Sequence, residues 1–410
     1  MSRRLAATSV TIAVAIALPA IAAALAKRPH YGGTLKVEIG AAVASLDPTT
    51  PPATADESAA RAEIDSLLYE SRDPRDGTFA GAQGSGPFRI SDWQPARELT
   101  LAANEKFPGG RPYVDSIDIT MNRAAKDRLL DLELNKTDFA QLAPQDARHA
   151  AERGVRVSLS QPDELIALVF KSSPSAPDKT TNALREAVSA AIDRAAIANF
   201  ILQKTGEPAS GLLPQWISGT EFLFAPPSAT SPADGIARAK ELLKQFPSSP
   251  KFVLGYDSAD SLAQAIAERI AVNAKEAGIT ITTLALPQSP ATGAASVAQS
   301  ASVDALIVRV RLTSPEPAEA LAGLLGAAAT IADVDASPLT ENANANGAAT
   351  AQDVLDRERA VMKTHRIVPL EWVPQVYGLS ARVRDWKAPA PGETWPFADV
   401  WLDPAPQPSP

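Results

Sequence analysis

Short apolar runs alternate along this chain with longer segments whose apolar residues recur every three or four positions. Residues 252–256 form one such run and predict a strand, and residues 261–277 follow with the spacing of an amphipathic helix. Gly278 stands just past that helix, where a glycine commonly ends one, and residues 279–284 predict the next strand. The alternation predicts an α/β protein built from several strand–helix–strand units.

Similar patterns predict elements elsewhere in the chain. Residues 84–138 indicate a turn, two strands, a Gly-Gly-Arg-Pro-Tyr corner, a third strand and an amphipathic helix. Residues 59–69 and 181–198 predict two further helices. Two low-complexity stretches, 287–302 and 327–352, predict surface loops.

The first residues indicate an export signal. Arg3 and Arg4 precede an uncharged stretch, 5–26, that ends in Ala-Leu-Ala, which is typical of a secretory signal peptide cleaved after Ala26. A retained membrane anchor is the alternative, because 22 uncharged residues could span a bilayer. The stretch is mostly alanine, which weakens its insertion compared with a leucine-rich span.

Composition narrows the function classes. Without residues 1–26, 384 of the 410 residues remain (410 − 26 = 384), enough for two domains with sizeable cores. The net charge of −8 and the pI near 5.2 argue against nucleic acid as a partner, since nucleic acid rewards a basic face. Cysteine is absent, which excludes disulfides, thiolate metal sites and an acylated lipoprotein cysteine. We expect a periplasmic protein that is not a lipoprotein.

No motif predicts catalysis, a metal or a cofactor. The histidines, His30, His149 and His365, are scattered without a second ligand at metal spacing. Phosphate loops, zinc-protease motifs and serine-hydrolase elbows are missing from the sequence. Asp356 and Glu358 stand among arginines on one helical segment and predict a solvated, charged face. We therefore predict that the protein is not an enzyme.

Five blocks of the chain carry a resemblance to a known family. They are YGGTLKVEIGAAVASLDP (31–48), the strand and helix pattern of 84–138, and the segments 168–197, 254–281 and 367–386. Their sequences and their order resemble the extracellular solute-binding proteins of family 5, the oligopeptide, dipeptide and nickel class that serves ABC importers.

The resemblance implies the architecture. The expected α/β fold is the two-lobed type II periplasmic binding protein fold with a discontinuous first lobe. Lobe I would comprise 27–167 plus 374–410, and lobe II 168–373. Only residues 49–83 stand where family members insert a small extra domain, so most of that domain is predicted to be missing.

The resemblance also indicates where a solute would bind. In peptide-binding members the strand end matching 307–317 supplies an arginine, a tryptophan and an aspartate. Arg309 matches the arginine, and neither of the other two is present. Arg309 and Arg311, two apart on a strand, could form a clamp for a carboxylate or phosphate. The alternative is that they face solvent or bridge to nearby acids.

Three further residues complete the candidate site. Trp216 lies in a loop that borders the ligand in the family, Tyr377 lies in the predicted crossing strand, and Ser45 opens the Ser-Leu-Asp-Pro corner. The expected function is capture of a small solute, peptide-like or anionic, between two lobes that close about a hinge. The partners would be that solute and an ABC permease in the inner membrane, and we expect a monomer. The alternative is a degenerate scaffold that acts as a sensor or protein-interaction module without transport.

Overall fold

A computed structural model describes residues 28–52, 54–69, 84–172, 180–217, 231–287, 303–332, 334–337 and 350–403. The predicted signal peptide lies outside these residues, as do 288–302 and 338–349 of the two predicted loops. No helix in the described ranges combines the length and apolarity needed to cross a membrane.

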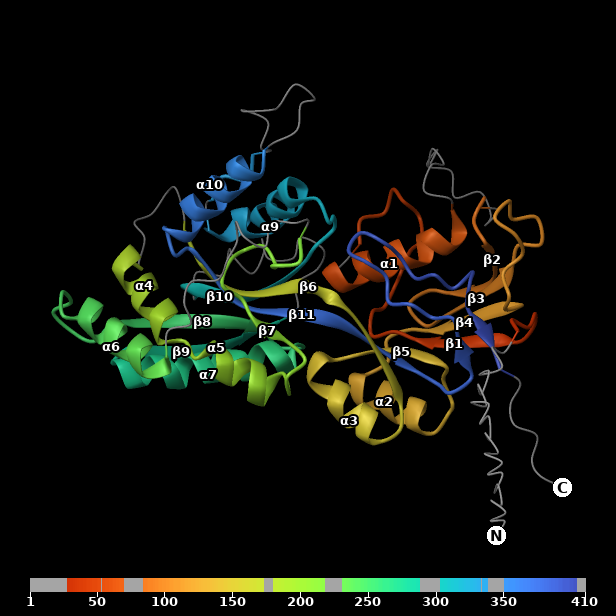
Figure 1. Cartoon of the computed structure of the whole chain (residues 1–410), viewed down its shortest axis with the longest axis horizontal. Coiled ribbons are helices and arrows are strands. Elements are labelled where there is room, and N and C mark those ends of the chain that lie inside the picture. The colour runs from red at the N-terminus through yellow and green to blue at the C-terminus, as the bar shows by residue number, and fades with distance from the viewer. Residues whose placement is uncertain are drawn as a thin grey trace, which may run out of the picture.

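All described strands except β12 and β13 belong to one large sheet, whose main order is β2-β3-β4-β1-β5-β11-β6-β10-β8-β9 (Figure 1). We call the half that contains β1–β5 lobe I and the half that contains β8–β10 lobe II. The strands of lobe I are β1 (Thr34–Glu38), β2 (Phe88–Gln94), β3 (Glu98–Ala103), β4 (Ser116–Thr120) and β5 (Phe139–Leu142). Its helices are α1 (Ala55–Leu68), α2 (Ala125–Glu133), a short 3₁₀ turn (Pro144–Asp146) and α3 (Ala147–Glu152).

Lobe II contributes β8 (Lys251–Asp257), β9 (Thr280–Leu286) and β10 (Ala305–Arg311). Its helices are α4 (Asn182–Ala191), α5 (Arg194–Ala196), a π turn (Ile197–Ile201), α6 (Pro232–Leu243), α7 (Ser261–Ala277), α9 (Pro317–Ala332) and α10 (Ala351–Met362). Helices α4, α6 and α7 lie on one face of its strands and α9 and α10 on the other (Figure 1). Alternate residues of one strand face the two layers, with Ile166 and Leu168 in one core and Leu165 and Ala167 in the other.

Two long antiparallel strands join the lobes. β6 (Arg156–Phe170) and β11 (Ile367–Leu379) pair along most of their length, and Figure 1 shows both running from one lobe into the other. β6 continues the sheet through β10, and β11 continues it through β5. Their pairing shifts register next to Pro369 and Pro374. Three two-residue strands complete the set: β7 (Glu207–Pro208) on β11, and β12 (Val383–Arg384) with β13 (Trp401–Leu402).

Lobe I contains a core of packed aromatic side chains. Phe139 lies within 5.6 Å, between ring centroids, of four other aromatic rings that come from β11 and the C-terminal segment. These rings belong to Tyr377, Trp386, Trp395 and Phe397. The C-terminal segment therefore returns to pack into lobe I, as the predicted discontinuous lobe requires. The residue boundaries of the lobes stay a prediction.

The residues at both ends of helix α7 predicted its range correctly. Helix α7 occupies Ser261–Ala277, and the Asp260 carboxylate accepts hydrogen bonds from the backbone of Leu262 and Ala263 at its start. Gly278 adopts a left-handed φ of 101° at its end.

Three predicted segments need correction. The helix predicted at 181–198 breaks after Ala191, because the Asp193 side chain caps a new short helix by accepting from Ala196 N. Helix α1 begins four residues before the predicted Ala59 because Thr54 caps it, accepting from Glu57 N. Of the loop predicted at 327–352, residues 327–332 belong to α9, and α10 begins at Ala351.

Candidate functional site

The end of β10 brings the two predicted arginines to the junction of the lobes. The Arg309 guanidinium donates to both carboxylate oxygens of Glu164 on β6, at 3.0 and 2.7 Å. Its third nitrogen lies 3.2 Å from the carboxylate of Asp260, the capping residue of α7. Asp260 therefore both starts a helix and holds Arg309.

Arg311 connects the lobes. Its Nε donates to the Asp163 carboxylate of β6 at 3.2 Å, and its Nη1 lies 3.9 Å from Glu63 Oε1 on α1 of lobe I. Glu63 is 4 % exposed and also accepts a hydrogen bond from the backbone N–H of Trp395 at 2.8 Å. Helix α1, β6, β10 and the C-terminal segment thus meet at one point.

Burial sets the electrostatics of this junction. Burial raises the pKa of Glu63 to about 7, although Arg311 and the Trp395 N–H oppose the rise. Burial also raises the pKa of Asp163. Asp56, in the first turn of α1, keeps contact with solvent, and its partial desolvation at the junction raises its pKa although Arg309 opposes the rise. The paired carboxylate of Glu164 raises the pKa of Arg309, so this guanidinium stays charged. We call Asp56, Glu63, Asp163, Glu164, Asp260, Arg309 and Arg311 the interlobe charge cluster.

The other predicted site residues lie in different settings. Tyr377 is fully buried in the aromatic core of lobe I, and its hydroxyl is within electrostatic range of Arg311, Glu63 and Asp163. Trp216 is half-buried, and its indole N–H donates to the backbone oxygen of Pro162, next to Asp163, at 2.8 Å.

The Ser45 side chain makes a local hydrogen bond and none to the charge cluster. Its hydroxyl accepts from Asp47 N at 3.1 Å, two residues away, and so shapes the Ser-Leu-Asp-Pro corner. Its role in ligand contact stays a prediction.

Neither arginine bridges to Asp304 or Glu316, the acids that the sequence offered as structural partners. Asp304 instead accepts from the backbone of Val253 at 2.9 Å. Both guanidinium groups are engaged by carboxylates from other elements. An anion entering here would have to displace a carboxylate, and anion binding by the pair stays a prediction.

The carboxylates of this cluster form no motif in the sequence. Asp163 and Glu164 were detectable as an acidic pair at the head of the apolar run in β6. Asp56 and Glu63 stand seven residues apart, which places them on one face of α1. Their assembly depends on four segments far apart in the chain, and local patterns do not report it.

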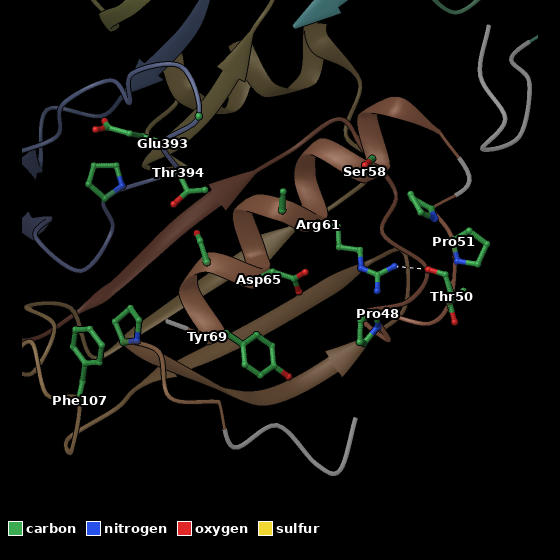
Figure 2. A pocket seen from close by; sticks show the side chains of 16 residues that line it. Pro48, Thr50, Pro51, Ser58, Arg61, Asp65, Tyr69, Phe107, Glu393 and Thr394 are labelled. Atoms are coloured by element: carbon green, nitrogen blue, oxygen red, sulfur yellow. Dashed lines mark hydrogen bonds between the residues drawn. The ribbon is translucent and has the colours of Figure 1, made fainter. Parts of the chain in front are cut away.

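A hollow lies on the side of α1 opposite the interlobe charge cluster. Figure 2 shows the side chains of Arg61, Asp65 and Tyr69 on this face of the helix, with Phe107 and Glu393 across from them. The hollow has a volume of about 1140 Å³. Arg61 closes one end by donating to the backbone oxygens of Thr50, at 2.6 Å, and Asp47. In the parts of the chain that the structure describes, no three His, Cys, Asp or Glu side chains gather closely enough to hold a metal ion.

Residues 32–332 match the model of the middle region of bacterial extracellular solute-binding proteins, family 5. The chain belongs to this family. The match begins before β1 and ends with α9, so it includes α1, β6 and β10 of the charge cluster.

Curated members of the family align over parts of the chain. The probable D,D-dipeptide-binding periplasmic protein DdpA of Escherichia coli is 27% identical over 137 residues, covering 33% of this chain and 26% of that protein. The nickel-binding protein NikA of Staphylococcus aureus is 28% identical over 214 residues, covering 48% and 40%. This chain therefore spans less than half the length of these relatives. Both are named as binding proteins rather than enzymes.

Solved structures share the fold. NikA from Staphylococcus aureus, in complex with Ni(L-His)2, superposes with a TM-score of 0.60 at 18% identity, over 78% of this chain and 69% of that one. NikA from Brucella suis, in complex with Fe(III)-EDTA, gives 0.65 at 16% identity, over 81% and 72%. The two-lobed α/β fold predicted from the sequence is confirmed.

Proposed function

We propose that this protein is the solute-capturing component of an ABC importer, which closes its two lobes around a small solute and delivers it to a membrane permease. It acts in the periplasm as a monomer, after removal of residues 1–26. It performs no chemistry on the solute.

The observation that carries this proposal is the joint between the lobes. β6 and β11 run through both lobes, and charged side chains of β6, β10 and α1 face one another beside them. A joint of two continuous strands permits rotation by twisting, and the register shifts at Pro369 and Pro374 interrupt the ladder that would resist it. A solute held at this position would contact both lobes.

The sequence predicts a peptide-like or anionic solute. The carboxylates around Arg309 and Arg311 argue against an anionic solute, because both guanidinium groups are already paired with negative charges. The same carboxylates could pair with the ammonium group of a peptide. The strand end of β10 alone supplies no such carboxylate.

Thermal melting tests the proposal. The purified protein is heated with peptides, amino acids, sugars, organic acids or metal ions, since a solute that binds only the native state must raise the melting temperature. We expect one class to raise it. In the Arg309→Ala, Arg311→Ala double variant, compared with that variant's own melting temperature, the shift should be lost for an anionic solute and kept for a cationic one, because the arginines attract only the former. Arg148→Ala is the matched control, because Arg148 pairs with Glu152 on exposed α3.

A folded protein whose melting temperature no class changes would contradict capture and support the alternative, a degenerate scaffold that acts as a sensor or interaction module. The short connection between β1 and β2 favours that alternative, because it leaves little chain for the small domain expected of the family.

A further inference from the structure

The interlobe charge cluster is short of positive charge. It contains five carboxyl groups and two guanidinium groups, a formal net charge of −3 (2 − 5 = −3). Arg128 of α2 is a further cation within range of Asp56, but it also faces Glu38 and Asp146. The acids therefore outnumber the cations on both sides of the junction.

Asp56 shows the imbalance most directly. It lies in the first turn of α1, and no ion pair to it is found among the described residues. Arg309 is the charge that affects it most, and Arg309 is already held by Glu164 and Asp260. Asp56 therefore presents a carboxylate to the junction without a cation of its own.

Buried polar groups point to the same place. The Tyr377 hydroxyl and the Trp395 indole N–H lie in side chains with 0% and 3% exposure. The indole N–H faces the hydroxyl oxygen, and neither group has another hydrogen-bond partner among the described residues. The hydroxyl is in electrostatic range of Glu63 and Asp163. The hydroxyl oxygen has a second lone pair that can accept a hydrogen bond from a bound ammonium or guanidinium group.

An aromatic side chain is anchored next to one of these acids, Asp163. Trp216 is half-buried and is fixed by its hydrogen bond to the Pro162 oxygen, one residue before Asp163. Carboxylates next to an indole ring form a common setting for organic cations, which gain from the ring face as well as from the negative charge.

We propose that the captured solute is a small organic cation with an ammonium or guanidinium group, seated between Asp56, Glu63 and Asp163 with the Tyr377 hydroxyl nearby. This inference rests on the proposed function and specifies its solute. The cation supplies the positive charge that the junction lacks. It lies against lobe I, to which Asp56 and Glu63 belong, and against Asp163 of the joint, beside Arg311 of lobe II.

Binding of a cation is coupled to proton release. Burial holds the pKa of Glu63 near 7, so this carboxyl is partly protonated in the free protein at neutral pH. A bound cation favours the ionised form and expels the proton. Affinity should therefore rise with pH through the neutral range, and binding heats should depend on the buffer's ionisation enthalpy.

Calorimetry and thermal melting of the purified protein test this with named probes. The cations are putrescine, agmatine and L-arginine, and the comparators are L-glutamine, L-glutamate, succinate and Ni²⁺. We expect a cation to bind, and Asp56→Asn to weaken it about tenfold, the loss of one ionic contact of about 1.4 kcal/mol. Asp56 is exposed, so this variant should fold.

A second variant tests the proton release. Glu63→Gln, whose amide oxygen can still accept from Trp395 N, should remove most of that release. Asp356→Asn, on exposed α10, is the control for both.

The outcomes separate this inference from the proposed function. Binding of glutamate, succinate, glutamine or Ni²⁺ without any organic cation would overturn the cation assignment and leave solute capture standing. If a cation bound equally to the wild type and to Asp56→Asn and released no proton, its binding site would lie outside this cluster. That result would also overturn the assignment. No binding by any probe, nor by the wider panel of peptides and sugars, would overturn both.

Discussion

At the scale of single residues, one buried carboxyl should make stability fall as the pH rises. Glu371 on β11 is fully buried, neither of its oxygens has a hydrogen bond among the described residues, and burial raises its pKa to about 9 despite nearby Arg194. Glu207 and Asp193 also face it and oppose its ionisation. At neutral pH the folded protein therefore holds a proton here that the unfolded chain releases.

The sign of the effect follows from this proton. Between a pKa of 4.5 in the unfolded chain and about 9 in the folded protein, a rise in pH favours unfolding. We expect wild-type stability to fall through this range relative to Glu371→Gln, which carries no proton to lose. Melting temperatures from about pH 5 to about pH 9 would check it. Parallel curves for the two proteins would mean that Glu371 is ionised in the folded state.

At the scale of elements, the attachment of α1 depends on a close backbone contact. Gly86 N donates to Leu68 O at 2.9 Å at the end of the helix, and a Cβ on Gly86 would lie 2.5 Å from the Leu68 carbonyl carbon. The backbone on both sides is fixed, since Asn104 also donates to Gly86 O at 2.8 Å. Gly86→Ala should therefore lower the free energy of unfolding by about 2 kcal/mol.

A second glycine gives the matched control. Gly326 lies in the middle of α9, where a Cβ would meet nothing within 4 Å. Gly326→Ala should raise stability by about 0.5 kcal/mol, because alanine is the better helix former. Urea denaturation of both variants measures the difference. Equal effects at the two positions would refute the proposed contact at the end of α1.

Elements were predictable where their own residues mark both ends. Asp260 and Gly278 mark α7, and its predicted range matches the structure. The charged face predicted for α10 was wrong at Glu358, which is 5% exposed. Its carboxylate accepts from the backbone N–H groups of Leu212 and Leu213, at 2.6 and 3.1 Å. Its charge pattern resembles that of a surface residue, and its partners lie about 145 positions earlier in the chain.

At the scale of the whole molecule, the two joining strands should be the most protected part of the backbone. β6 and β11 have a hydrogen-bonded neighbour on each side, whereas β2 and β9 end the order of described strands. Amides in the middle of the sheet should exchange with solvent only when a lobe opens, and those at its ends by local fraying. Hydrogen exchange resolved by peptide would check this. Exchange in β6 and β11 as fast as in β2 would show a loose joint.

The fold of the whole molecule could be predicted because family resemblance covers elements in all parts of the chain, and the structural comparison confirms it. The candidate site could be predicted only in part. Arg309 and Arg311 follow from one strand end, but Glu63 and Asp163 reach Arg311 from α1 and β6. Such contacts arise from tertiary packing, which no local pattern in the sequence encodes.

The hydrogen bond between the Trp216 indole and the Pro162 backbone oxygen makes Trp216 a built-in fluorescent reporter. The indole is tethered at 2.8 Å to the strand about which the lobes would turn, next to the carboxylates that would receive a solute. Its emission colour depends on the polarity around the ring, so capture would change it without any attached dye. Replacing the other five tryptophans with phenylalanine would leave a single-fluorophore biosensor whose reporter is already in place.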